Sequence, residues 1–214
     1  MPRKIRRKCC GWRFTYSSPR QARPARATFA YDCISSSAAS LAERLHLARR
    51  PSIRREWRSI GAVLPKLGPG AYCVLFELDR DMTIRTGRLG RVDYQSGVYA
   101  YVGSAMKGIS SRMPHHVRPP VRPHWHIDYV RPKGRPVAIV AAESDTRVEC
   151  PIARYLADAF DVAKGFGASD CSCSGHLFRG QDASLLLDAV VDAVRSVGRQ
   201  PNVTLSEWAP LRSE

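Results

Sequence analysis

Two triplets of glycine and tyrosine stand out among the residues whose types could do chemistry. Gly70-Ala71-Tyr72 opens one β-prone stretch, and Tyr101-Val102-Gly103 lies near the end of another, GVYAYVGSA. The second stretch also contains Gly97-Val98-Tyr99, but two active-site strands cannot share seven residues. We therefore predict that two separate strands pair and bring Tyr72 and Tyr101 together, where phenols can serve in general acid–base catalysis.

With these triplets and the blocks around them, the sequence resembles the GIY-YIG nuclease superfamily. It is most similar to the DUF123 branch, whose members are sometimes called Uri-type endonucleases. The similarity covers residues 68–180 and rests on the blocks GAYCVLFEL, GRLG, GVYAYVGSA, HWHIDYV, EC and GFGASDCSCSGHLF. The resemblance implies a phosphodiester hydrolase that acts on nucleic acid, for which we expect DNA, with the assistance of Mg²⁺ or Mn²⁺.

The family's pattern also assigns roles to individual residues. Tyr72 matches the tyrosine of the first motif, and Tyr101 and Gly103 match the second. Arg112 matches an arginine on the following helix, and His116, one helical turn later, matches the histidine after it. Together with a metal-binding glutamate, the two tyrosines, Arg112 and His116 form the expected catalytic set. The residues expected to contact the substrate are Gly103, Ser104, Arg118 and His126.

The glutamate of this pattern is Glu149, and it has two interpretations. The resemblance makes it the Mg²⁺ ligand, and a carboxylate suits this hard cation. Thr146 and Glu149 also have the spacing of a capping box, in which Glu149 would bond back to the cap. Pro151 argues against the box, because it would then lie inside the second turn, whereas a helix starting near Cys150 places Pro151 at its favoured first position.

The expected residue types fit phosphodiester hydrolysis. An arginine and a cation can stabilise the negative charge that builds up in the transition state. A water molecule must also lose a proton, and a phenol with a pKa of about 10 can accept it only if nearby positive charge lowers that pKa. We expect Arg112 and a cation at Glu149 to provide that charge.

Two departures from the family pattern concern local geometry. Tyr72 and Tyr101 have 28 residues between them, which predicts an inserted strand and loop. Pro114 lies within the segment 110–118, so we expect a helix capped by Ser110 or Ser111, with the proline in its first turn. In addition, His115 replaces the arginine that relatives often have.

A second kind of site is suggested by Cys171, Cys173 and His176, to which Cys150 could be added. Thiolates and imidazoles are zinc ligands, but the C-x-C-x-x-H pattern lacks the usual paired spacing. We therefore favour a role in shaping a loop beside the cleft and keep zinc as the alternative.

The positive charge is concentrated near the N-terminus. The chain has 214 residues and a formal net charge of +15, of which residues 1–60 carry +12, with 15 Lys/Arg against three acids. Such a segment can bind phosphate backbones without sequence preference. It can equally be sequence upstream of the true start or a targeting peptide. We expect a disordered arm over 1–67, the GIY-YIG-like domain over 68–180, and a helix followed by a loose tail over 181–214.

The remaining patterns predict an α/β (α+β) fold with a small, mainly antiparallel sheet flanked by helices. No apolar run approaches the ~20 residues of a membrane span. The lack of a clear signal peptide predicts a cytoplasmic protein whose seven cysteines are reduced. Three functions are open: a metal-dependent endonuclease, an inactive nucleic-acid-binding module on the same scaffold, and a zinc-stabilised interaction domain.

Overall fold

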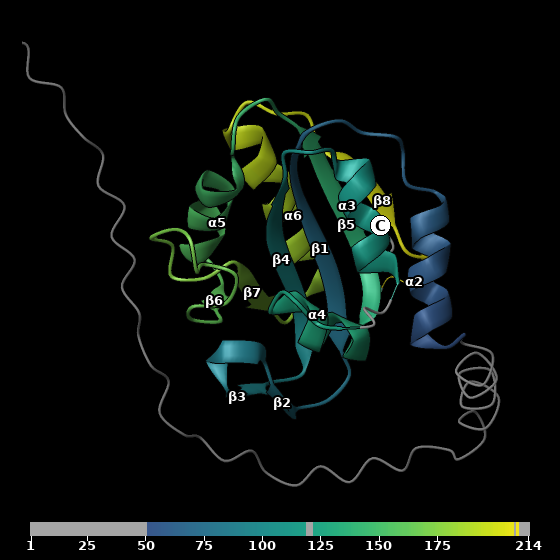
Figure 1. The fold of residues 1–214 in the computed structure, drawn as a ribbon, viewed down its shortest axis with the longest axis vertical. Helices are drawn as coiled ribbons and strands as arrows, with labels where there is room; N and C mark the ends of the chain where they lie inside the picture. Colours follow the sequence, from purple (N-terminus) through teal and green to yellow (C-terminus); the bar gives the residue numbers. More distant parts are fainter. Residues whose placement is uncertain (1–50, 119–121, 208, 210–214) are drawn as a thin grey trace, which may run out of the picture. The chain divides into compact units, whose positions relative to one another are not determined.

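A six-stranded antiparallel sheet forms the centre of the protein (Figure 1). The computed structural model describes residues 51–118, 122–207 and 209, so most of the predicted arm lies outside the described residues. The sheet order is β6-β7-β4-β1-β5-β8. Its strands are β1 (Gly70–Leu78), β4 (Gly97–Ala105), β5 (Arg135–Glu143), β6 (Asp161–Val162), β7 (Leu177–Gly180) and β8 (Asn202–Leu205). The predicted α/β class with an antiparallel sheet flanked by helices is confirmed.

Helices cover both faces of this sheet. Helices α5 (Glu149–Ala157) and α6 (Ala183–Ser196) pack on one face. The opposite face is covered by α2 (Ile53–Ala62), α3 (Ile109–Val117) and the short α4 (Ile127–Val130), which is followed by the 3₁₀ turn η2 (Arg131–Lys133). No helix in the described part of the chain has the length and apolarity needed to cross a bilayer.

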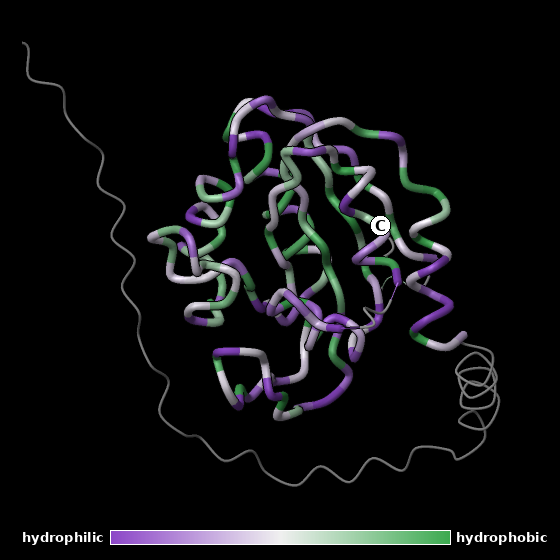
Figure 2. Tube along the Cα trace, in the orientation of Figure 1, coloured by the Kyte–Doolittle hydropathy of each residue, from purple (hydrophilic) through white to green (hydrophobic). Residues whose placement is uncertain are grey.

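Alternation along the strands produces two different hydrophobic layers, because successive side chains of a strand point to opposite faces. The aliphatic face lies under α5 and α6 and includes Cys73, Leu75, Ala100, Val102 and Val140. The aromatic face lies under α2, α3 and α4 and includes Tyr72, Phe76, Tyr99, Tyr101 and Phe166. Both layers are buried, and the central strands appear as largely hydrophobic segments in Figure 2.

The predicted insertion between the two tyrosine strands is a hairpin outside the main sheet. It consists of β2 (Met82–Arg85), the 3₁₀ turn η1 (Gly87–Leu89) and β3 (Arg91–Tyr94), with β2 and β3 antiparallel. A buried hydrogen bond of 2.9 Å between the hydroxyls of Thr86 and Tyr94 ties the end of β2 to the end of β3. The hairpin therefore has its own internal support.

Two helices begin earlier than the sequence indicated. Helix α3 begins at Ile109 after Gly108, whose φ of 110° favours glycine, and not after Ser110 or Ser111. Pro114 consequently lies in the second turn of α3, where it removes one backbone hydrogen bond. Helix α5 begins at Glu149, so Pro151 is its third residue. This position is tolerated because the first N–H groups of a helix have no intrahelical acceptor.

The compact unit is also longer at both ends than the predicted domain. It begins at Arg49, and α2 belongs to it although the sequence analysis assigned this segment to the arm. Trp57 of α2 is 1% exposed, and its Nε1 donates a hydrogen bond of 2.9 Å to the carbonyl of Gly134. At the other end, residues 202–205 form β8 and pair with β5, so the prediction of a loose tail is wrong there.

Candidate functional site

Tyr72 and Tyr101 lie side by side on the aromatic face, with ring centroids 6.4 Å apart. Their strands β1 and β4 pair, as predicted, in a register that puts Tyr72 opposite Gly103. A Cβ atom at Gly103 would lie 2.5 Å from the ring and hydroxyl of Tyr72. Glycine at position 103 therefore leaves the space in which the Tyr72 ring extends across β4.

His116 of α3 is the direct partner of Tyr72. Its Nε2 lies 2.9 Å from the Tyr72 hydroxyl, and the imidazole is 1% exposed. Burial, together with the positive charges of Arg131 and Arg112, holds the pKa of His116 well below its usual value. The ring is therefore neutral near pH 7. Its other nitrogen, Nδ1, is buried without a hydrogen-bond partner among the described residues, so either neutral tautomer leaves one ring nitrogen unsatisfied.

Arg112 lies one turn before His116 on α3, and its guanidinium stacks on Trp125. The distance from Cζ to the ring centroid is 4.3 Å, a cation–π contact. His115 and His124 pack edge-on against the same indole. Stacking uses the flat face of the guanidinium, so its in-plane N–H groups can still bind an anion. This role of Trp125 was not predicted, although a tryptophan between two histidines is visible in HWHIDYV.

In the protein alone the phenols do not have a lowered pKa; the expected lowering was assigned to Arg112 together with a cation at Glu149. Burial raises the pKa of Tyr72 well above its usual value, and the neighbouring Tyr101 adds to this effect. The pKa of Tyr101 is likewise raised, first by burial and then by Glu149. Arg112 opposes the shift in both tyrosines but does not overcome the loss of hydration that disfavours a phenolate. In the protein alone, both phenols are therefore hydrogen-bond donors.

Glu149 is the first residue of α5, and its carboxylate lines the same cleft as the tyrosines. The predicted alternative of a capping box is absent: the N-cap is Val148, and no side chain caps the helix there. The Glu149 side chain is 12% exposed, and its nearest ion pair is a loose contact of 3.8 Å to Arg147. Burial raises the pKa of this carboxyl.

These groups share a cleft of about 860 Å³. Its lining includes all five predicted catalytic residues and three of the four predicted substrate-binding residues: Tyr72, Tyr101, Arg112, His116, Glu149, Gly103, Ser104 and His126. The cationic side chains in the lining are Arg88, Lys107, Arg112 and Arg147, against the carboxylates of Glu149 and Asp170. The excess of cations suits an anionic ligand. Arg88, Lys107, Arg147 and Asp170 were not predicted, because only the fold brings these loop residues to the cleft.

Two predicted substrate-binding residues have contrasting positions. The Nδ1 of His126 accepts a hydrogen bond of 3.1 Å from the backbone N–H of Gly167, which in the neutral ring leaves the proton on Nε2. Arg118, by contrast, follows the end of α3 and lines a separate groove with Arg58 and Lys66. It is not part of the cleft lining.

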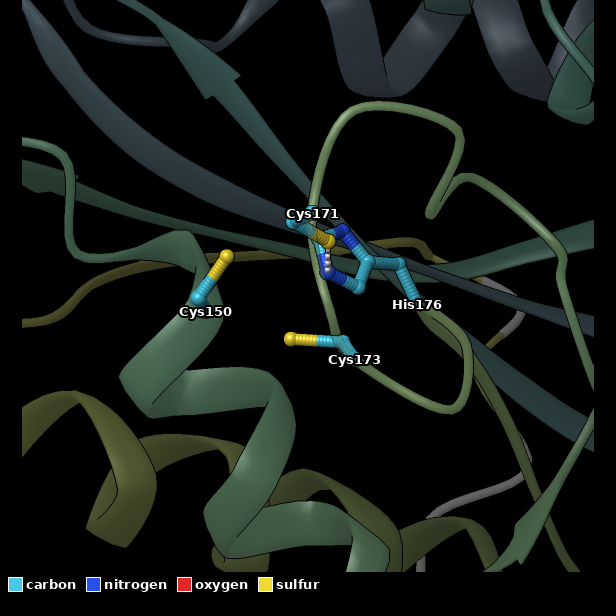
Figure 3. Close-up of side chains that lie close together, drawn as sticks. All are labelled: Cys150, Cys171, Cys173 and His176. Atoms are coloured by element: carbon cyan, nitrogen blue, oxygen red, sulfur yellow. Dashed lines mark hydrogen bonds between the residues drawn. The ribbon is translucent and has the colours of Figure 1, made fainter.

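Beside the cleft, three cysteines and a histidine form a compact cluster (Figure 3). Cys150 comes from the first turn of α5, whereas Cys171, Cys173 and His176 come from the loop between β6 and β7. The ligand atoms of the four side chains all lie within 4.8 Å of one another. His176 also lines the cleft, so the two sites share a wall.

Fold and site together define a mixed α/β domain whose antiparallel sheet supports a cationic, tyrosine-containing cleft. A profile of the family described as "Domain of unknown function DUF123" matches residues 71–199, and the chain belongs to this family. The matched region includes α6, which the sequence analysis had placed after the domain. No curated protein and no solved structure matches the chain.

Proposed function

We propose that this protein is a divalent-metal-dependent endonuclease of the GIY-YIG superfamily that hydrolyses phosphodiester bonds in DNA. The observation that carries the proposal is the convergence of five side chains from β1, β4, α3 and α5 in one cleft. They are Tyr72, Tyr101, Arg112, His116 and Glu149. A structural role could explain each of these residues separately, but it would not explain why all five line one cleft that also has an excess of cationic side chains.

Arg112 is the group placed to hold the phosphate. Its stacking on Trp125 fixes the guanidinium plane, which reduces the conformational entropy lost when the N–H groups bind two phosphate oxygens. Lys107 and Arg88 line the same cleft and add favourable charge for the flanking backbone. Bound in this way, the phosphodiester would lie against Tyr72 and Tyr101.

Tyr72 and His116 form the part of the site that can move a proton. Because the Tyr72 pKa is raised, its hydroxyl takes a proton from the attacking water only while it gives its own proton away. Neutral His116, whose Nε2 is 2.9 Å away, can accept that proton in the tautomer with Nδ1–H. Tyr101 also has a raised pKa, and it would donate a hydrogen bond to the water or to a phosphate oxygen.

The residues around Glu149 fit a hard cation. Glu149 offers a largely buried carboxylate with only a loose ion pair, and Asp170 adds a second carboxylate to the lining. Oxygen ligands with remaining water positions are what Mg²⁺ and Mn²⁺ require. When bound, the cation would supply positive charge that stabilises the transition state and lowers the pKa of adjacent groups.

The experiment is a cleavage assay with the purified full-length protein. The substrates are duplex, nicked, branched and single-stranded DNA, with the same structures in RNA, each with Mg²⁺, Mn²⁺ or EDTA. We expect metal-dependent nicking of DNA, which Glu149→Gln prepared in the same way should lack. Tight binding without cleavage of any substrate would instead support an inactive nucleic-acid-binding module on this scaffold.

A further inference from the structure

We propose that Cys150, Cys171, Cys173 and His176 bind one zinc ion in a tetrahedral structural site. This inference is independent of the proposed function, since the ion would be held outside the reacting groups. Three thiolates and one imidazole are a ligand set typical of structural zinc. Soft sulfur ligands also separate this site from the oxygen-lined region around Glu149, which suits Mg²⁺.

The geometry is close to that of a filled site. With Zn–S near 2.3 Å and Zn–N near 2.0–2.1 Å, tetrahedral angles require a sulfur–nitrogen separation of about 3.6 Å and sulfur–sulfur separations of about 3.8 Å. The Sγ of Cys171 lies 3.5 Å from Nε2 of His176. All four ligand atoms lie within 4.8 Å of one another, so contraction by about 1 Å or less would complete the site.

The local backbone already brings the ligands together. In the loop between β6 and β7, the N–H of Gly165 donates to the carbonyl of Ser174, and the N–H of His176 donates to the carbonyl of Phe166. These bonds fold the loop back on itself and bring His176 to the wall of the cleft. Cys150 approaches the cluster from the start of α5 (Figure 3).

Exposure distinguishes these cysteines from an ordinary core thiol. Cys73 is fully buried on the aliphatic face, where it packs as a small apolar residue. Cys150, Cys171 and Cys173 are only partly buried, and their sulfur atoms point toward a common centre (Figure 3). A metal ion can therefore reach the cluster. A disulfide between two of these cysteines would account for only two of the four side chains, whereas one metal ion accounts for all of them.

The site would act as a clamp between α5 and the loop. Cys150 follows Glu149 directly, and the carbonyl of His176 accepts a hydrogen bond of 2.9 Å from the N–H of Val102 on β4. Val102 lies between Tyr101 and Gly103. A zinc ion would thus hold the start of α5 at a fixed place relative to the strand that carries Tyr101, and Glu149 would be positioned without touching the metal.

The first test is metal analysis of the full-length protein purified under reducing conditions. We expect close to one zinc per chain, and loss of most of it in Cys150→Ser and in Cys173→Ser. The matched control replaces Cys9, Cys10 and Cys33 by serine, and Cys73→Ala is the core control; both should keep the zinc. No zinc in the wild type, iron in its place, or loss of zinc only in the control triple variant would overturn the proposal.

A second measurement uses the wild-type protein, so it tests the site even if the cysteine variants do not fold. Wild-type protein reconstituted with Co²⁺ should show intense visible absorption of a tetrahedral centre and a thiolate-to-cobalt charge-transfer band in the near ultraviolet. His176→Cys should retain the bands in a shifted position, since cysteine is also a zinc ligand. A weak spectrum typical of octahedral oxygen ligation would contradict the site. Neither readout depends on cleavage, so inactivity toward nucleic acid would leave the outcome for zinc unaffected.

Discussion

The two faces of the sheet are built from the same strands but bury different chemistry. The aliphatic face meets α5 and α6 through apolar side chains such as Ile152 and Leu186. The aromatic face buries polar groups among its rings, including His116 and the hydroxyls of Tyr72 and Tyr101. An unsatisfied buried polar atom such as His116 Nδ1 reduces stability, so its presence among the rings of the aromatic face indicates a role beyond packing.

The difference shows how one sheet can combine a stabilising apolar layer with a polar cleft. Alternation lets each strand contribute to both layers, so β1 supplies Leu75 to one face and Tyr72 to the other. Substitutions on the aliphatic face should therefore change the free energy of unfolding. Substitutions in the cleft should change catalysis, and the following predictions test this separation.

The largest effect is expected from Glu149→Gln. The substitution keeps shape and hydrogen bonding but removes the charge that a hard cation needs. Metal-dependent cleavage should fall below detection, while the free energy of unfolding stays within about 1 kcal/mol of the wild type. Cleavage assays and urea unfolding measure both quantities. A large loss of stability with a normal metal response would give Glu149 a structural role.

The next largest effect separates the tyrosines of the aromatic face. Tyr72→Phe and Tyr101→Phe should each lower the cleavage rate by a factor of about 10²–10⁴, because each removes a hydroxyl to which the proposed function assigns a role in acting on the attacking water. Tyr99 is the matched control, since its hydroxyl donates to the carbonyl of Gln95 and its ring stacks on Phe76. Tyr99→Phe should stay within about a few-fold of the wild-type rate, a modest change compared with general acid–base effects.

Substrate binding should persist in all three tyrosine variants, because the proposed function assigns the phosphate contacts to the basic residues of the cleft. Single-turnover rates and affinities for an uncleaved substrate provide the comparison. If Tyr99→Phe is as damaging as Tyr101→Phe, the wrong tyrosine has been assigned to the site.

On the aliphatic face, Ile152→Ala should show the opposite pattern. Ile152 is fully buried, and its truncation leaves a cavity that typically costs about 2–5 kcal/mol of unfolding free energy. The cleavage rate of the folded variant should remain close to that of the wild type. Denaturant unfolding and rates measured well below the melting temperature test this. A rate loss as large as that of Tyr72→Phe would show that the two faces are coupled.

The smallest effect concerns pH. The pKa of His116 is lowered in the folded protein, so on acidification the unfolded chain takes up this proton first. His116 should therefore cause a loss of stability as the pH falls below about 6.5, with a slope of at most about 1.4 kcal/mol per pH unit, and no change above that pH.

The variant His116→Gln isolates this contribution to the pH dependence. His126 and His176 also have lowered pKa values and remain in both proteins, so the difference between the two stability profiles belongs to His116. Urea unfolding from pH 5 to pH 8 should give a flatter profile for the variant below about pH 6.5. Parallel profiles would mean that His116 is not kept neutral by burial.

Features that depend on short sequence patterns were predicted better than features that depend on the whole fold. Alternation in GVYAYVGSA predicted the two faces of β4, and the glycine–tyrosine spacing predicted the pairing of Tyr72 with its neighbour strand. Both depend on local periodicity. Arg112 by itself does not lower the phenol pKa, because burial in the aromatic layer outweighs its single charge.

Signals that depend on tertiary contacts were missed or undervalued. Helix α2 was assigned to the arm, because its basic residues and the turn at Leu67–Gly70 indicated a boundary, whereas Trp57 is buried against the sheet. The cysteine cluster was given less weight than a loop role, because the C-x-C-x-x-H pattern lacks the usual paired spacing of zinc ligands, and the packing of α5, which brings Cys150 to the loop, is not visible in the sequence. Arg118 was expected in the cleft, but it follows the end of α3, and the sequence does not show that this position lines a separate groove.

The β2–β3 hairpin has a consequence for how this scaffold can diversify. It leaves the sheet at Leu78 and returns at Gly97, two residues that are themselves paired at the end of the β1–β4 ladder. Lengthening such a connection changes its closure entropy little, by about 0.6 kcal/mol for each doubling. Its turn also contributes Gly87 and Arg88 to the rim of the cleft. Insertions there can therefore alter which molecules enter the cleft while the register of the tyrosine strands stays the same, which makes the hairpin a natural point for evolving or engineering new selectivity.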